Sequence, residues 1–213
     1  MRKQEKKKDI LNILKNHIDN NLKQYMLVSI MFFLGIIISV IVINNIDKNS
    51  KQYEEVSITT TIDSLKKGYE IDNIELLKKI TLNHIIFTTL MWFLGCSLIG
   101  IPIVYLLVVY KGFSLGYTIS YIILAIGTGK GIWFSIITLL LQNIIIVPAT
   151  LSLAVSSINL YKSIIKNKKI ENVKLEIIRH TVISLFILIA LFVAGIVEVY
   201  ISNFILKLCI NYF

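Results

Sequence analysis

The feature that most constrains this chain is an unbroken apolar stretch near its beginning. Residues 26–43 run for eighteen positions without a charged side chain. A helix needs about 20 apolar residues to cross the hydrocarbon core of a bilayer. The stretch is longer than the apolar core of a secretion signal, and the residues 44–47 that follow it offer no small-residue cleavage site. We therefore interpret it as a retained membrane span.

Later apolar segments extend this interpretation to the whole chain. Further spans are predicted at residues 85–110, 113–126, 132–158 and 181–206. Only 16% of the residues are charged, whereas soluble domains carry about 25%. Since lipid cannot satisfy backbone hydrogen bonds, spans of this kind must be helical. We therefore expect an all-α, polytopic membrane bundle with about five transmembrane helices within residues 26–206.

The second and third spans are expected to meet at a short connection. Lys111 and Gly112 are the residues between them. Pro102 falls well inside the second span, where a missing N–H should kink a helix. After the third span, residues 127–131 form a glycine-rich turn whose spacing does not match a phosphate-binding loop.

Charge on the polar segments predicts the orientation. The segments are a basic amphipathic region (1–25), an outer loop (44–82), a basic cytoplasmic loop (159–180) and an outer tail (207–213). With the amino terminus inside, fourteen Lys and Arg residues lie on the cytoplasmic side and eight outside. Cytoplasmic loops of membrane proteins are enriched in these residues, so we expect the amino terminus inside and the carboxyl terminus outside. The net charge of +9 then indicates anionic lipid at the inner surface rather than nucleic acid.

The outer loop carries a signal for the start of a helix. Asp72 is followed three positions later by Glu75, the spacing of a capping box. We expect a short helix there that leads into the second span.

Glu198 is the one acidic residue inside an expected span. An ionisable group in hydrocarbon is costly unless it is paired, so it is a functional candidate. Gln142 and Asn143 lie at a compatible depth in the fourth span, and Lys130 is another candidate partner. We expect Glu198 to be a structural hydrogen-bonding group whose charge is dispensable. The alternative is a small-solute or ion transporter that uses the Glu198 carboxyl.

Small residues at a spacing of four predict close helix contacts. Gly112, Gly116 and Ser120 follow this spacing, and Cys96 and Gly100 repeat it beside Gly95. Such residues let two helices approach closely. The contact could lie within one chain or between the copies of a homo-oligomer.

The remaining reactive residue types do not form a recognisable site. His84 and His180 are expected at opposite membrane surfaces, and His17 on the basic segment, so we interpret all three as interfacial residues. Cys96 and Cys209 are far apart and lack metal-binding spacing. We expect no metal, no cofactor and no enzyme activity, because no nucleophile stands with a base and no carboxylates are paired.

Several short strings in the chain are similar to a known family. They are LMWFLGCSLIGIP (90–102), KGFSLGY (111–117), QNIIIVP (142–148) and EVYIS (198–202). Their order and spacing resemble the stage II sporulation protein M family of endospore-forming bacteria. The residues that make the resemblance specific are Gly95, Gly100, Pro102, Gly112, Gly116, Gln142, Asn143, Pro148 and Glu198.

The resemblance implies a role in engulfment during sporulation. It implies a multi-pass protein of the mother-cell membrane at the sporulation septum, acting as a non-enzymatic scaffold. Its partners would be two septal peptidoglycan hydrolases, an amidase/endopeptidase and a lytic transglycosylase. These would thin the septal wall so that the membrane can migrate around the forespore.

Overall fold

The computed structural model describes residues 18–45, 72–97, 100–166 and 170–202. This part of the chain contains the long helices α2 (Leu22–Asn45), α4 (Asn73–Cys96), α5 (Gly100–Ile126), α6 (Thr128–Lys166) and α7 (Ile170–Ile196), followed by a π-helical turn, η1 (Val197–Ser202). The prediction of an all-helical membrane bundle is confirmed. Most of segments 1–25 and 44–82, and all of 207–213, lie outside the described residues, as do His17 and Cys209.

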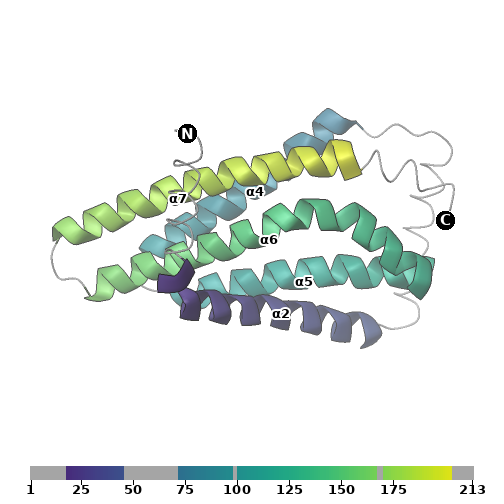
Figure 1. Ribbon diagram of the computed structural model, residues 1–213, viewed down its shortest axis with the longest axis horizontal. Helices are drawn as coiled ribbons and strands as arrows, with labels where there is room; N and C mark the ends of the chain where they lie inside the picture. Colours follow the sequence, from purple (N-terminus) through teal and green to yellow (C-terminus); the bar gives the residue numbers. More distant parts are fainter. Residues whose placement is uncertain (1–17, 46–71, 98–99, 167–169, 203–213) are drawn as a thin grey trace, which may run out of the picture.

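Successive helices run in opposite directions across the bundle (Figure 1). The start of α2, the α4–α5 connection and the α6–α7 connection lie at one end, on the left of the view. Helix α6 is central, because it contacts α2, α4, α5, α7 and η1. Its residues 149–160 are buried or partly buried on every side, including Thr150, Leu153, Ser157 and Leu160. Small side chains in this half let the surrounding helices pack closely against it.

Four of the described helices are long and apolar enough to cross a membrane. They are α2, most of α5, the second two-thirds of α6, and α7 with η1. Helix α4 packs beside them but falls outside this set. Its first half carries Lys78, Lys79 and Asn83, which lower its mean hydropathy.

The connection predicted at Lys111 and Gly112 is wrong. Helix α5 runs without interruption from Gly100 to Ile126, and both residues lie near its middle. Helix α4 instead ends at Cys96, where Ser97 takes an extended backbone conformation and caps it, and α5 begins at Gly100. Residues 85–126 are uncharged apart from Lys111, so a prediction based on charge placed the break at that residue.

Pro102 does not kink a span, which corrects a second expectation. It lies in the first turn of α5. The N–H groups of a first turn have no intrahelical partner, so proline costs nothing there. Pro148 is the proline inside a helix, and α6 is visibly bent (Figure 1). A proline in that position removes the backbone bond to the carbonyl of Ile144.

Local signals explain where two of the helices begin and end. The side chain of Asp72 accepts hydrogen bonds from the backbone N–H groups of Ile74 (2.9 Å) and Glu75 (3.2 Å), so it is the N-cap of α4. Gly127 separates α5 from α6 with a φ of 92°, a conformation that side chains with a Cβ rarely adopt. A single residue therefore makes this turn.

Candidate functional site

Helices α2 and α5 approach each other closely enough for their backbones to touch. A Cβ atom added to Gly112 would collide with the carbonyl oxygen of Phe32. One added to Gly116 would collide with the hydroxyl of Ser39, and one added to Gly35 would lie 2.7 Å from the backbone nitrogen of Phe113. The small-residue motif thus faces α2 of the same chain. The sequence left open whether this motif contacts a helix of the same chain or of a second copy. In the structure it contacts a helix of the same chain.

Sequence reasoning missed one half of this contact. Gly35 and Ser39 on α2 are also four residues apart, so the first span carries the matching small-residue motif. Ser39 donates its hydroxyl to the carbonyl of Ile36 (2.6 Å), so this buried hydroxyl is satisfied within α2. Ser120 follows on α5 and is partly buried.

Gly95 lies at a polar junction of α4, α6 and α7. A Cβ at Gly95 would lie 2.9 Å from Nε2 of His180 and 3.1 Å from Cα of Ser157. Nδ1 of His180 is 2.8 Å from Oγ of Ser156. Ser157 donates to the carbonyl of Met91 across the helix interface (3.1 Å). The absence of a side chain at Gly95 therefore makes room for a buried imidazole.

The expectation that His84 and His180 are interfacial is wrong. Their side chains are only 6% and 1% exposed. Both helices begin well before the expected span boundaries, α4 at Asn73 and α7 at Ile170, so each histidine lies inside its helix and packs against neighbouring helices. Gly100, also expected on a contact face, lies at the start of α5 against the carbonyl of Leu94.

Polar side chains also join α2 to α6 at the end of the bundle where α2 begins. Asn159 donates to the side-chain oxygen of Asn21 (2.8 Å), and the hydroxyl of Tyr25 donates to that of Ser152 (3.4 Å). Hydrogen bonds between helices of this kind replace the hydrophobic driving force that lipid cannot supply.

Gln142 and Asn143 do not hydrogen-bond to Glu198. Asn143 donates to the carbonyl of Leu139 in its own helix (2.8 Å). Gln142 is buried, and its Oε1 has no hydrogen-bond partner among the described residues. Lys130, the other candidate partner, is exposed at the start of α6.

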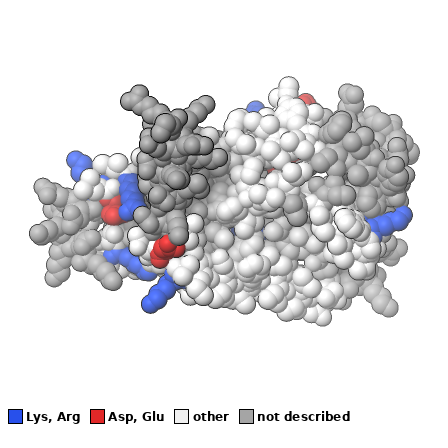
Figure 2. Space-filling model, viewed as in Figure 1, with Lys and Arg blue, Asp and Glu red and all other residues white. Residues whose placement is uncertain are grey.

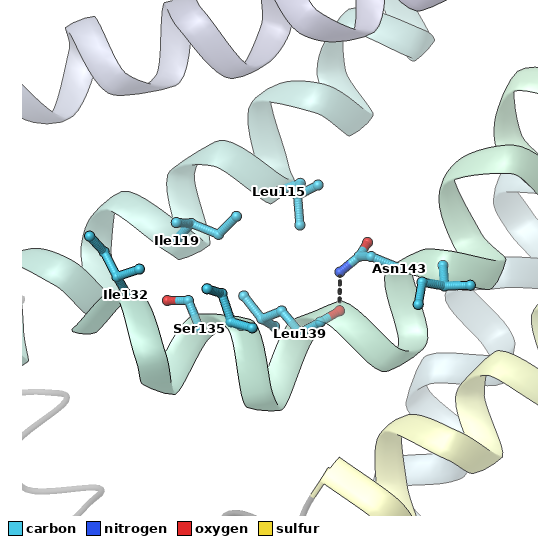
Figure 3. Close-up of a pocket in the computed structure, with 8 residues that line it drawn as sticks. Leu115, Ile119, Ile132, Ser135, Leu139 and Asn143 are labelled. Atoms are coloured by element: carbon cyan, nitrogen blue, oxygen red, sulfur yellow. Dashed lines mark hydrogen bonds between the residues drawn. The ribbon is translucent and has the colours of Figure 1, made fainter. Parts of the chain in front are cut away.

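Asn143 instead lines an apolar groove of about 360 Å³ between α5 and α6. Figure 3 shows Leu115 and Ile119 of α5 facing Ile132, Ser135 and Leu139 of α6 across it. The outer side chains Ile132 and Ile144 are exposed, so the groove opens toward lipid. Its apolar lining gives it no chemistry of its own.

Glu198 has an electrostatic partner that the sequence did not indicate. It interacts with Lys111 of α5, and Lys111 also interacts with His84 of α4. The ammonium group of Lys111 lies 4.7 Å from the ring centroid of Phe87, also on α4. The described residues contain no cluster of three His, Cys, Asp or Glu side chains that could hold a metal ion.

A family model described as Stage II sporulation protein M matches residues 28–203. The chain belongs to the stage II sporulation protein M family. No curated protein and no solved structure matches it significantly.

The matched region of this stage II sporulation protein M family member covers every contact described above except those at the first residues of α2. The four strings that carry the resemblance occupy distinct places in the bundle. They form the α4–α5 junction, the face of α5 against α2, the part of α6 before Pro148, and η1. Membership in the family makes the chain a sporulation-related membrane protein.

Proposed function

We propose that the protein is a non-enzymatic scaffold of the sporulation engulfment machinery in the mother-cell membrane at the septum. Its partners are the septal amidase/endopeptidase and lytic transglycosylase, which thin the peptidoglycan while the membrane migrates around the forespore. The observation that carries the proposal is the family match from within α2 to the end of η1, because it reaches every described helix.

The acidic residue content of the expected spans favours a scaffold over the alternative of a transporter. A carrier that uses Glu198 needs a carboxyl group able to exchange its proton or ion with both sides of the membrane. Glu198 is the one acidic residue inside an expected span, whereas proton and ion relays use several ionisable groups.

The surface at one end of the bundle favours anionic lipid as a further partner. Figure 2 shows Lys and Arg side chains gathered on the left, where α6 and α7 meet. Exposed cations at this end include Lys23, Lys162, Lys174 and Arg179. Each Lys or Arg near an anionic membrane surface contributes about 1 kcal/mol of attraction. Charge of this kind anchors the scaffold to the cytoplasmic leaflet.

Co-purification from sporulating cells tests the scaffold. The full-length protein with an amino-terminal affinity tag is extracted in mild detergent, and the bound proteins are identified by mass spectrometry. We expect both classes of peptidoglycan hydrolase to be enriched over an unrelated tagged multi-pass protein from the same cells. Recovery of intact protein with neither enzyme would overturn the proposal.

A pair of glycine variants provides the matched control. Gly116→Leu should lose the hydrolases, since its side chain collides with α2. Gly129→Leu should retain them, because a Cβ at that position meets no atom within 4 Å. Equal recovery by both variants would show that the hydrolases bind without the folded bundle.

A further inference from the structure

The groove between α5 and α6 has the length and depth of one membrane leaflet. Its α6 side runs from Ile132 to Ile144, a distance of about 18 Å along the helix. Its α5 side is formed by Leu115 and Ile119, which lie roughly 14 Å and 8 Å inside the end of the α5 candidate span at Leu124. Half of the hydrocarbon core is about 15 Å thick. The groove therefore reaches from near the membrane surface to near the middle of the bilayer.

The mouth of the groove lies at the level of the lipid headgroups. Trp133 follows Ile132 and is exposed, and tryptophan side chains of membrane proteins gather at this interface. Gly131 packs against Ile123, close to the end of the α5 span, so the start of α6 lies at the same depth. Helices α5 and α6 contain no Asp or Glu, and Lys130 is exposed in the first turn of α6. The charge at the mouth therefore attracts an anion.

A buried hydroxyl lies in the groove below this mouth. Ser135 is 4% exposed and lines the groove between Ile132 and Leu139 (Figure 3). Its oxygen has no hydrogen-bond partner among the described residues. A buried hydroxyl without a partner is costly, so an acceptor bound inside the groove would satisfy it. Ser135 lies about 8 Å further along the helix than Lys130, so this acceptor belongs on the hydrocarbon side of an anion at the mouth.

The width of the groove fits a hydrocarbon chain and not a helix. A volume of about 360 Å³ over about 18 Å of length gives a mean cross-section of about 20 Å². This is the width of one extended hydrocarbon chain, whereas a helix about 10 Å across is several times too large. Apart from Ser135 and Asn143, the lining consists of Leu and Ile side chains. Helix contacts in membranes favour small residues instead, as between α2 and α5.

We propose that the groove between α5 and α6 binds one anionic phospholipid of the leaflet on the side of the Gly127 turn. Its phosphate lies near Lys130, an ester carbonyl accepts a hydrogen bond from Ser135, and one acyl chain follows the aliphatic lining. The site lies at the opposite end of the bundle from the basic surface where α6 and α7 meet (Figure 1), so it is separate from attraction to the cytoplasmic leaflet. The proposal is independent of the scaffold function.

Titration of the delipidated full-length protein with phospholipid tests the site. Native mass spectrometry in mild detergent counts the bound molecules of dioleoyl phosphatidylglycerol, which is anionic, and of dioleoyl phosphatidylethanolamine, which is zwitterionic. We expect one saturable site with an affinity about fivefold higher for the anionic lipid, because one lysine near the headgroup distinguishes the two. Glycerophosphoglycerol, the same headgroup without acyl chains, should not bind. The proposal is overturned if no lipid binds saturably, or if the headgroup alone binds as tightly as the lipid.

Two groove variants and a matched exposed variant locate the binding site. Ile119→Phe and Ile136→Phe each place a larger side chain in the groove and should weaken phosphatidylglycerol binding at least about fivefold. Leu106→Phe enlarges an exposed residue of α5 outside the groove and should bind like the wild type. Ile136 is itself exposed, so its variant keeps the fold, and melting temperatures verify this. Wild-type affinity in both groove variants, or an equal loss in Leu106→Phe, would refute the site.

A pair of lysine variants tests the anionic part of the ligand. Lys130→Gln should reduce the preference for phosphatidylglycerol over phosphatidylethanolamine to within about twofold. Lys79→Gln removes an exposed cation from the start of α4, at the same end of the bundle, and should keep the preference. An equal loss in both variants would indicate general attraction to the surface and contradict the proposal. So would a bound polypeptide that phospholipid cannot displace and that Ile136→Phe loses, because a partner helix would then occupy the groove.

Discussion

At the scale of single residues, the bundle depends on positions where a side chain is absent or small. Gly35, Gly112 and Gly116 let the backbones of α2 and α5 touch, and Gly95 accommodates the ring of His180. At Gly35 and Gly112 the nearest atoms belong to the backbone, which cannot move aside without displacing a helix. A single methyl group is therefore enough to separate two elements.

We predict that Gly112→Ala destabilises the protein and that Gly129→Ala does not. The new methyl group at position 112 collides with the carbonyl oxygen of Phe32, and overpacking of this kind costs about 1–3 kcal/mol. At position 129 it meets no atom within 4 Å, and alanine favours a helix by up to about 1 kcal/mol over glycine. Thermal unfolding in detergent measures both. An equal melting temperature for the two variants would contradict the contact.

A second pair of substitutions compares a buried hydroxyl that has a hydrogen-bond partner with one that has none among the described residues. Ser156→Ala leaves Nδ1 of His180 without its partner at 2.8 Å, and we expect a loss of about 1–3 kcal/mol. Ser135 is also buried on α6, but its hydroxyl has no partner among the described residues. Ser135→Ala should therefore be neutral or stabilising. Unfolding midpoints in the same detergent decide between them, and a larger loss at Ser135 would refute the pairing.

At the scale of the elements, the ends of the helices follow local rules, whereas their packing faces do not. Asp72 caps α4, Pro102 occupies the first turn of α5, and Gly127 alone reverses the chain between α5 and α6. Each of these residues acts on backbone groups only a few positions away. Which side of a helix is buried depends instead on neighbours that are distant in the sequence.

We predict that Asp72→Ala loosens the start of α4 and that Asp72→Asn preserves it. Alanine cannot accept the hydrogen bonds from Ile74 and Glu75, and loss of an N-cap costs about 0.5–2 kcal/mol. Asparagine keeps an acceptor oxygen in the same place. Hydrogen exchange of the first-turn amides of α4 measures the effect. Unchanged exchange in the alanine variant would mean that packing, not the cap, holds this end.

At the scale of the whole molecule, the alternating directions of the helices agree with the distribution of charge. The start of α2 and both basic ends of the α6–α7 hairpin lie at one end of the bundle (Figure 1). Because Lys111 lies inside α5, it leaves the cytoplasmic total, which falls from fourteen to thirteen against eight outside. The excess of Lys and Arg on the cytoplasmic side therefore remains.

We therefore predict that reporters fused after Gly127 and at the carboxyl terminus lie outside, and that one fused after Lys166 lies inside. The reason is the excess of Lys and Arg on segments 1–25 and 159–180. A phosphatase reporter, active only outside, and a fluorescent one, active only inside, measure the three positions. If the phosphatase were inactive after Gly127 and active after Lys166, either the orientation would be reversed or α4 would not cross the membrane. If the carboxyl terminus were inside while the other two reporters behaved as predicted, α7 would not cross the membrane.

The sequence by itself determined that this protein is a helical membrane bundle of the stage II sporulation protein M family, and it located the Asp72 cap and the small-residue motif of α5. These properties follow from run length, charge and short-range spacing, all of which act within a few turns of chain. Tertiary structure decided that α4 ends at Cys96 and α5 begins at Gly100, that Gly112 meets α2 of the same chain, and that His84 and His180 are buried. Each of these depends on which helix faces meet. Hydropathy cannot report this, because a residue facing lipid and one facing another helix are equally apolar.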